Sequence, residues 1–392
     1  MDSLDHAPLA PRILHLASWY PSAVHGTLGN FVQRHIDAIA TQCPGEVWFA
    51  AAAAKGQKIP LDTVQSKGLI TERLVYFTAK KPVVRQTTNA LLQLAEAHEG
   101  PPFDLVHLHV AYPAGRAARQ LAKRWKVPLV VTEHWTAYHA DQRHKLPFWR
   151  KRSMQLTGRA STLLCPVSED LASSMRDFGM GSQAMVIPNV VNIDLFKPAE
   201  TRSGADRPFE LLHISSLSDE QKNISGMLRA IAAALPTCPK LRVSIIGDGD
   251  PRPHQSYARS LGLDQRVSIQ GEISLTEVAE RMRTANALLL FSNFENFPCV
   301  IPEAWASGIP VISTDVGGIA EHVTPERGVL IERGNEVALT TAIVNMVNAP
   351  SSAHLDATAL RKTAESMFSM NAIAAQYQRA YQKAFQLQTK RP

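Results

Sequence analysis

The sequence has few cysteines and no long hydrophobic run. Its four cysteines lie far apart and form no C-x-x-C pair; they are Cys43, Cys165, Cys238 and Cys299. This spacing fits neither a disulfide framework nor a zinc finger, so we expect reduced thiols in a cytosolic protein. The alanine run at residues 50–54 is far shorter than the roughly 20 apolar residues that a membrane-spanning helix needs. Residues 1–6 are acidic and have no apolar segment behind them, so no signal peptide is predicted.

Low-complexity segments and solenoid-length repeats are also missing from the 392 residues. A globular chain of this length has room for two domains, each with its own core. The charge is uneven, because residues 1–197 carry 22 Lys and Arg against 15 Asp and Glu. No recognised nucleic-acid-binding module accompanies this charge, so no nucleic-acid partner is expected.

The positive charge is concentrated at residues 143–159, a stretch without any acid. Phe148 and Trp149 lie among the basic residues. Two interpretations stay open for this stretch. It is a solvated helix face, or it contacts an anionic membrane surface or a phosphorylated lipid acceptor.

The most informative stretch is residues 287–313. It begins with a continuously apolar run, which is typical of a parallel strand buried on both faces, and a polar turn follows. Pro298 suits the first turn of a helix, and Gly308 suits its C-terminal end. Residues 310–313 predict the next buried strand. In such strand–loop–helix–strand units, ligands bind at the carboxyl ends of the strands.

Two acids in this stretch are separated by seven residues. Glu295 lies in the predicted loop, and Glu303 lies about one turn into the predicted helix, with its side chain leaning toward the helix N-terminus. Both carboxylates can therefore face one crevice, together with the amides of Cys299 and Val300. Amides and a helix dipole favour a phosphate, and carboxylates suit a vicinal diol, so the pattern fits a nucleotide sugar. The alternative is that Glu303 only complements the helix dipole and that Glu295 is a solvated loop residue.

The segment from Ser292 to Val323 resembles the E-x7-E signature of retaining GT-B glycosyltransferases of family 4, the group 1 transferases. The matching residues are Glu295, Glu303, Gly308-Ile309-Pro310-Val311 and Gly317-Gly318. The similarity extends over nearly the whole chain and implies an α/β fold of GT-B type, with two Rossmann-like parallel-sheet domains facing across a cleft. It places an acceptor domain at residues 1–197, with a C-terminal helix at 375–392 packing back onto it. The nucleotide-sugar donor domain is expected at 198–374, after a polar linker at 199–207.

A glycine-bearing loop follows the first predicted strand, at residues 12–17. Such a loop lets the backbone approach a diphosphate closely, and a mobile surface loop is an equal alternative. The resemblance places this loop beside the donor diphosphate and the acceptor. It assigns Gly29 to the donor, and Gly26 and Thr27 to the acceptor.

Histidines mark the next strands. His107 and His109 share one face of the strand predicted at 105–109, but no acid or cysteine at matching spacing accompanies them, so a structural role is expected rather than a metal pair. His134 follows the carboxyl end of a strand, and the resemblance gives it contact with the transferred sugar. Its neighbours Glu133 and Trp135 are assigned to the acceptor. By resemblance, residues 163–171 and 185–196 are the closing strands of the first domain.

A lysine just before a predicted helix, Lys222, can neutralise a leaving diphosphate, and a plain surface lysine is the alternative. The resembling family has an arginine and a lysine in this loop, both on the diphosphate. Lys222 matches the lysine, whereas Ser216 occupies the position of the arginine. Either backbone amides and Lys222 suffice, or a cation from elsewhere compensates. By resemblance, Gly271 and Ile273 belong to the loop that covers the nucleobase.

Asp248 and Asp250 spell the D-x-D pattern with which another glycosyltransferase fold binds a divalent metal. They lie in a strand-to-helix turn, where Gly and Asp are expected for backbone reasons, so no metal site is predicted.

These features predict a bacterial hexosyltransferase-type enzyme that moves a sugar from a UDP- or GDP-type donor to a glycan or lipid-linked acceptor. The resemblance implies retention of configuration without a metal, and no further cofactor is expected. Glu303 is assigned to the ribose diol, Glu295 to sugar hydroxyls and Lys222 to the departing diphosphate. The remaining donor contacts are assigned to the start of the predicted helix, at Phe297, Pro298, Cys299 and Val300.

Two other functions are compatible with the sequence: a nucleotide-sugar epimerase of the same architecture, and a non-catalytic sugar-nucleotide or glycan-binding protein. The expected location is the cytoplasm, with peripheral contact to the inner face of the membrane through residues 143–159. Polysaccharide or lipid-linked glycan assembly is the process that the resembling family suggests.

Overall fold

The protein is described here by a computed structural model that covers residues 10–80, 82–181, 183–200, 207–349 and 355–389. The chain divides into two compact units, residues 1–190 with 370–392, and residues 191–369. These boundaries lie several residues before those suggested by the sequence, at 197–198 and 374–375. Most of the expected linker, residues 201–206, falls outside the described residues. The cleft between the two domains stays a prediction.

The first unit is built on a seven-stranded sheet with the strand order β3-β4-β2-β1-β5-β6-β7. Neighbouring strands are parallel except for β3, which pairs antiparallel with β4 at one edge. The strands are β1 (Ile13–Ala17), β2 (Gly45–Ala53), β3 (Thr63–Lys67), β4 (Ile70–Thr78), β5 (Leu105–His109), β6 (Leu129–Glu133) and β7 (Leu163–Pro166). The helices are α1 (Asn30–Ala40), α2 (Val83–Glu96), α3 (Gly115–Trp125), α4 (Phe148–Ala160), α5 (Glu169–Phe178) and α13 (Met370–Thr389).

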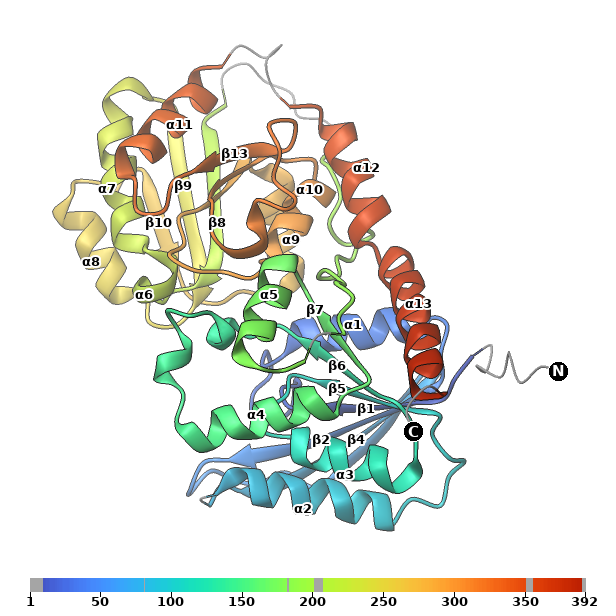
Figure 1. The fold of residues 1–392 in the computed structure, drawn as a ribbon. Helices are drawn as coiled ribbons and strands as arrows, with labels where there is room; N and C mark the ends of the chain where they lie inside the picture. The colour runs from blue at the N-terminus through green and yellow to red at the C-terminus, as the bar shows by residue number, and fades with distance from the viewer. Residues whose placement is uncertain (1–9, 81, 182, 201–206, 350–354, 390–392) are drawn as a thin grey trace. The chain divides into compact units, whose positions relative to one another are not determined.

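Helices cover both faces of this sheet (Figure 1). Alternate residues of β1 point to opposite sides, so Leu14 and Leu16 pack in one core with α2 and α3, and Ile13 packs in another with α1 and α13. Every residue of β1, β5, β6 and β7 is buried. Burial on both faces explains why these strands lack an alternation of apolar and exposed polar residues. Their few polar residues, among them His15, His107 and His109, are buried too.

The second unit has a six-stranded, wholly parallel sheet with the order β10-β9-β8-β11-β12-β13. Numbered along the chain this is 3-2-1-4-5-6, the order of a Rossmann fold. The strands are β8 (Phe209–Ser216), β9 (Leu241–Asp248), β10 (Val267–Gln270), β11 (Ala287–Leu290), β12 (Val311–Thr314) and β13 (Gly328–Ile331). The helices are α6 (Asp219–Lys222), α7 (Ile224–Ala234), α8 (Arg252–Ser260), α9 (Leu275–Thr284), α10 (Val300–Ala306), α11 (Glu336–Asn348) and α12 (Ala357–Phe368).

Two hydrophobic cores lie on the two sides of this second sheet. Leu211 of β8 packs with α7, α8 and α11, whereas its neighbour Leu212 packs with α9, α10 and α12. The predicted strand–loop–helix–strand unit at residues 287–313 is confirmed as β11, α10 and β12. Gly308, just after α10, has a φ of 68°, a left-handed conformation that glycine adopts without steric cost.

One predicted strand is wrong. Residues 185–196 form no strand, although Met185 and Ile187 donate backbone hydrogen bonds to Leu164 and Pro166 at the edge of the first sheet. Because donors to one neighbouring strand alternate along the chain, the next donor would be Asn189 rather than Pro188, and the segment continues without forming a strand.

The C-terminal helix begins at Met370 and packs on the first unit. The hydroxyl of Tyr381 lies 2.9 Å from His107 Nδ1, and that of Tyr377 lies 3.0 Å from Thr132 Oγ1. The structure therefore ties the end of the chain to β5 and β6, in the middle of the first sheet.

Candidate active site

In the second unit, the strand order reverses between β8 and β11, and ligands of such sheets bind at the carboxyl ends of the strands beside this reversal. The loop and short helix after β8 carry Lys222, and the loop after β11 carries Glu295. Two side chains that are 73 residues apart in sequence therefore meet at the switch point of the sheet.

Lys222 and Glu295 form an ion pair in which Nζ of the lysine donates to Oε1 of the glutamate. The residues are 8% and 6% exposed, so both charges are almost completely removed from water. Ser292 Oγ donates a second hydrogen bond, of 2.8 Å, to the same carboxylate oxygen. The pairing shows that Lys222 is no solvated surface lysine and that Glu295 is no solvated loop residue.

The loop that carries Glu295 is held on two sides. Thr314, at the end of β12, donates a 2.7 Å hydrogen bond to the carbonyl of Ser292. Gly318 N donates to the carbonyl of Asn296 at 2.7 Å. At Gly317, where φ is 57°, an added Cβ would lie 1.9 Å from the carbonyl oxygen of Glu295. Glycine is therefore required there, because both the backbone conformation and the space exclude a side chain.

Glu303 lies in α10 and is 2% exposed, so it is not a solvated helix residue. Phe297 is also buried, and its ring packs at 4.4 Å from the ring of His322 and at 5.4 Å from that of Phe368. Its side chain thus anchors the start of the helix, and only its backbone can face a ligand. Pro298, Cys299 and Val300 are half-buried at that start. Their contacts with a donor, and that of Glu303 with a ribose, stay predictions.

The other donor residues lie at neighbouring strand ends. Ser216 ends β8, and its carbonyl accepts a 2.7 Å hydrogen bond from Ser215 Oγ. Gly271 and Ile273 follow β10, and Ile273 packs against the core under α9 and α10. An added Cβ at Gly271 meets nothing within 4 Å, so the structure gives no backbone reason for glycine there.

The D-x-D pair lies in an exposed turn at the end of β9. Asp250 is bound by the guanidinium of Arg252 two residues later, with Nη2 to Oδ2 at 2.6 Å. At the preceding Gly247, an added Cβ would lie 1.8 Å from the carbonyl oxygen of Ser215. Gly247 is therefore needed for close backbone packing. This agrees with the prediction that glycine and aspartate occur at this turn for backbone reasons.

In the first unit, the strand order reverses between β1 and β5. Gly26 and Thr27 follow β1, whereas Glu133 and Trp135 lie at the end of β6, one strand beyond β5. Gly29 precedes α1 with a φ of 71°, and an added Cβ would lie 2.5 Å from the carbonyl group of Trp19. Glycine at this position therefore lets the loop pack closely against its own backbone at Trp19. Gly26 and Thr27 are exposed, and an added Cβ at Gly26 meets nothing within 4 Å.

His134 and Trp135 lie directly after β6, within a group of aromatic rings. The imidazole of His134 is 4.6 Å from the ring of Phe31, and Trp135 packs edge-on against Trp19 at 5.6 Å. Burial lowers the pKa of His134 well below its usual range, so the imidazole is neutral at neutral pH.

Glu133 ends β6 and is fully buried. Its carboxylate accepts hydrogen bonds from the amides of Ala111 and His134 and from the hydroxyl of Tyr138. Burial raises its pKa to about 7. These donors fix the loop after β6, and the acceptor contact assigned to Glu133 stays a prediction.

Arg150 and Tyr112 lie near this loop and were not singled out from the sequence. The guanidinium of Arg150 lies over the ring of Tyr112 at 4.5 Å and over that of Trp135 at 5.9 Å. Its Nε is buried and donates no hydrogen bond within the described part of the chain. The only sequence signal for Arg150 was its place in the basic stretch at 143–159. That stretch forms a 3-10 helix at Arg143–Lys145 and nearly all of α4, where Phe148 and Trp149 are 79% and 70% exposed.

The histidines of the first sheet form a buried cluster with a third member, His15 of β1. His15, His107 and His109 are all fully buried, and His15 Nδ1 lies 3.1 Å from His109 Nε2. Both nitrogens of His107 have partners, in Tyr381 and Thr132, whereas His15 Nε2 and His109 Nδ1 have none among the described residues. One ring nitrogen of each histidine lies within 4.8 Å of the others, so the three could together hold a metal ion. The structural role expected for His107 and His109 stays a prediction.

Among the described residues, no helix combines the length and the apolar character needed to cross a bilayer.

Comparison with solved structures identifies the fold as that of the GT-B glycosyltransferases. Sucrose-phosphate synthase from Thermosynechococcus elongatus superimposes with a TM-score of 0.79, covering 96% of this chain and 99% of its own at 21% identity. HepE of Anabaena, solved with UDP and glucose, superimposes with a TM-score of 0.74 at 20% identity, covering 95% and 99% of the two chains. The predicted fold class is thereby confirmed.

Sequence comparison gives the same class. Residues 208–349 match the family described as glycosyl transferases group 1, and residues 65–195 match glycosyltransferase family 4. D-inositol 3-phosphate glycosyltransferase of Streptomyces avermitilis is 28% identical over 64% of this chain and 59% of its own length. Glycogen synthase of Mycobacterium tuberculosis is 27% identical over 71% and 68%. The chain thus matches less than two thirds of the length of that first relative.

Proposed function

We propose that this protein is a glycosyltransferase that moves a hexose-type sugar from a nucleoside-diphosphate sugar to an acceptor. The observation that carries the proposal is the buried ion pair of Lys222 and Glu295 at the switch point of the second sheet. The pair lies inside residues 208–349, the segment that matches the group 1 transferases. The complex of HepE with UDP and glucose supports a UDP-type donor.

The geometry of the pair suggests how each residue acts on the donor. Lys222 has three N–H bonds on Nζ and directs one to Glu295, so the others are available for the oxygens of the departing diphosphate. Both hydrogen bonds to Glu295 engage Oε1, and Oε2 accepts none within the described residues. This second oxygen is suited to the sugar hydroxyls. Glu303 would bind the ribose diol, and the backbone at Phe297, Cys299 and Val300 would lie beside the sugar and phosphates.

We further propose that configuration is retained and that no metal ion takes part. A carboxylate that is paired with a lysine and hydrogen-bonded to a serine is a poor nucleophile, so Glu295 is unsuited to a covalent intermediate. Attack on the same face as the leaving group, assisted by a diphosphate oxygen, needs no such nucleophile. Lys222 supplies the positive charge that a metal provides elsewhere. His134, neutral because burial lowers its pKa, would contribute a hydrogen bond to the transferred sugar.

The first unit is the proposed acceptor domain, and its contacts point to a phosphate-bearing acceptor. Arg150 is held between the rings of Tyr112 and Trp135, and its buried Nε–H lacks an acceptor within the described residues. A guanidinium in this setting binds phosphate oxygens well. The naming of several relatives as D-inositol 3-phosphate glycosyltransferases supports the same chemistry.

Exposed Phe148 and Trp149, beside Lys151 and Arg152, support peripheral contact with an anionic membrane and a lipid-linked acceptor. On this proposal the protein works at the inner face of the cytoplasmic membrane, in polysaccharide or lipid-linked glycan assembly. Vesicles with and without anionic lipid test the contact. Replacing Phe148 and Trp149 by serine should abolish co-sedimentation with anionic vesicles, and unchanged sedimentation would rule out this surface.

The activity is tested by incubating the protein with UDP- and GDP-sugars and measuring release of the nucleoside diphosphate. A transferase releases it slowly to water and faster with a phosphorylated polyol acceptor. Glu295→Ala should abolish both rates. If neither donor raises the melting temperature and no nucleoside diphosphate forms, the proposal is wrong.

The same experiment separates the two alternatives. An epimerase converts the donor without an acceptor, so a changed sugar recovered from the donor-only incubation would favour it. Position 216 carries serine where the resembling family has an arginine, and this difference favours a binding protein that is not an enzyme. It would show a raised melting temperature with nucleotide sugar but no hydrolysis.

A further inference from the structure

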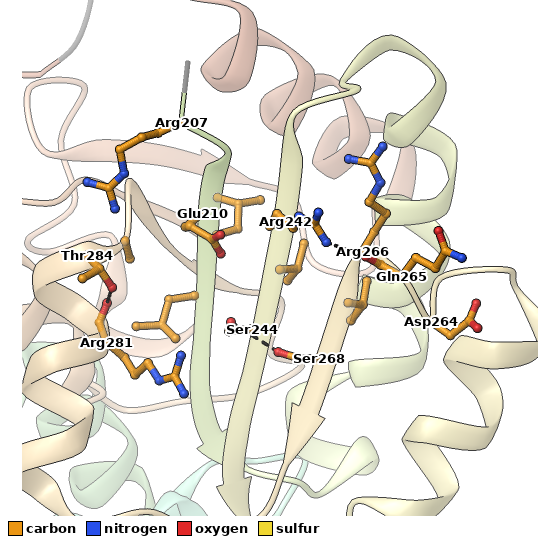
Figure 2. Close-up of a pocket in the computed structure, with 15 residues that line it drawn as sticks. Arg207, Glu210, Arg242, Ser244, Asp264, Gln265, Arg266, Ser268, Arg281 and Thr284 are labelled. Atoms are coloured by element: carbon orange, nitrogen blue, oxygen red, sulfur yellow. Dashed lines mark hydrogen bonds between the residues drawn. The ribbon is translucent and has the colours of Figure 1, made fainter. Parts of the chain in front are cut away.

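A pocket in the second unit lies at the amino-terminal ends of the strands, opposite the ends beside Lys222 and Glu295. It has a volume of about 350 Å³ and is lined by residues at the start of β8, β9 and β10 and at the end of α9. Figure 2 shows these residues, with Arg281 reaching from α9 toward the strands. None of the residues assigned to the donor lines this hollow. We call it the amino-edge pocket.

The floor of the pocket is the face of β9 and β10. Ser244 of β9 pairs in register with Ser268 of β10, and their hydroxyls lie 3.4 Å apart. One step earlier, Glu210 of β8 pairs in register with Arg242 of β9. Because side chains two residues apart on a strand point to the same face, the serines, the acid and the arginine open on one side of the sheet.

The arginines of the pocket keep most of their hydrogen-bonding capacity. Arg242 donates one bond, from Nη1 to the carbonyl of Gln265 at 2.6 Å, which fixes the guanidinium and leaves its other N–H groups without protein acceptors in the described residues. A fourth arginine of the pocket, Arg266, donates from Nη1 to the carbonyl of Pro239. Within the same residues, Arg207 and Arg281 form no ion pair and no side-chain hydrogen bond, and Glu210 forms no ion pair with any of the four arginines.

This combination selects the chemistry of a ligand. Guanidinium groups with unused N–H donors favour a phosphate over an apolar molecule. The unpaired carboxylate repels a bare anion, and the two hydroxyls contribute little to binding one. All three groups accept hydrogen bonds from the hydroxyls of a polyol. A volume of about 350 Å³ is within the range of small-molecule sites and suits a single sugar ring with a phosphate.

We propose that the amino-edge pocket binds a phosphorylated sugar. Arg242 and Arg281 supply positive charge for the phosphate, and the sugar hydroxyls lie on Glu210, Ser244 and Ser268. Arg207 lies at the rim and adds positive charge. The proposal stands independently of the donor site, since it uses other residues at the other edge of the sheet.

Calorimetric titration of the whole protein tests this, with glucose 6-phosphate, inorganic phosphate and glucose as the three probes. We expect glucose 6-phosphate to bind more tightly than inorganic phosphate, and glucose not to bind measurably. The double substitution R242Q/R281Q should weaken glucose 6-phosphate by about tenfold or more, because it removes two charge-assisted contacts. Arg259→Gln, which removes an exposed arginine of α8 outside the pocket, is the matched control and should change nothing.

Glu210→Gln gives the sharper result. It should reduce the preference for glucose 6-phosphate over inorganic phosphate, because the neutral amide is a weaker acceptor of sugar hydroxyls than a carboxylate and no longer repels the bare anion. Glucose 6-phosphate binding that survives R242Q/R281Q unchanged would place the ligand elsewhere and overturn the proposal, as would no binding by the wild type. If R242Q/R281Q proves unfolded by circular dichroism, the single substitutions R242Q and R281Q replace it. Each should weaken glucose 6-phosphate binding, and unchanged affinity in both would contradict the phosphate contacts.

Discussion

Acidification should destabilise the first unit, because histidines are buried in its sheet without their protons. Burial lowers the pKa of His15 to about 3 and that of His35 to about 4, from an ordinary 6.5. As the pH falls below 6.5, the unfolded chain binds protons at these positions and the folded chain does not. The free energy of unfolding therefore decreases as the pH is lowered from 6.5 toward the pKa that these histidines have in the folded protein.

The magnitude follows from about 1.4 kcal/mol per pH unit and per proton. Between pH 8 and pH 5, His15 and His35 each remove about 2 kcal/mol of stability. Glu133 acts in the opposite direction, because burial raises its pKa to about 7, and it returns roughly 2–3 kcal/mol over the same range. His107, His109 and His134, whose pKa values burial also lowers well below the usual range, add to the acid lability.

The assay is urea unfolding at a series of pH values, followed by tryptophan fluorescence. Five of the six tryptophans lie in the first unit, so the signal reports mainly on that unit. His15→Phe removes one titrating ring, and its plot of unfolding free energy against pH should be flatter near pH 5 by about 1.4 kcal/mol per pH unit. His144→Gln, which replaces an exposed ring, is the matched control. A slope that is the same in His15→Phe and in the wild type would refute the reasoning.

Three further predictions concern the candidate site. Lys222→Met should destabilise the second unit by about 3–5 kcal/mol, because it leaves the Glu295 carboxylate buried without its partner. The double variant with Glu295→Leu should recover most of that stability and still lack transferase activity. Equal melting temperatures of the single and double variants would contradict this. Gly317→Ala should cost about 2–4 kcal/mol, because it combines a clash with positive φ, and Gly271→Ala, where the space is open, should cost less than about 1 kcal/mol; equal urea midpoints would show that the loop yields. Arg150→Gln should raise the KM for a phosphorylated acceptor about tenfold or more and leave acceptor-free donor hydrolysis unchanged, and a loss of hydrolysis instead would give Arg150 a different role.

The sequence predicted those parts of the fold whose cause is local. The apolar run at 287–290, Pro298 and Gly308 each carry a backbone preference, and the strand, helix and strand appear where these residues put them. The 185–196 prediction failed because only Met185 and Ile187 of that segment donate backbone hydrogen bonds to β7 in the described residues. Gly29 was singled out for a diphosphate, whereas its left-handed φ and its close neighbour Trp19 in the same loop are visible only in the structure.

Side-chain partners were not predictable in the same way. Lys222 and Glu295 are each interpretable alone, as a cation for a phosphate and an acceptor for hydroxyls, but their contact joins residues 73 positions apart. Only the strand order places their loops side by side. Arg150 was one basic residue among several, and its stacking on Tyr112 and Trp135 depends on three separate elements of the first unit. Glu133 looked available beside His134, whereas the fold surrounds it with donors.

The pairing of Lys222 with Glu295 argues for a ligand more strongly than either residue does. A buried ion pair adds little to stability, since apolar residues of similar volume often serve as well or better. Its presence at the carboxyl edge of β8 and β11, where parallel sheets bind ligands, therefore has a better explanation in chemistry than in folding. Glu295 holds the lysine in place and neutralises it while the site is empty. A diphosphate that competes for Lys222 also leaves Glu295 freer to accept from sugar hydroxyls. One pair can thus bind both halves of a nucleotide sugar, even with serine at position 216 where a second cation would otherwise stand.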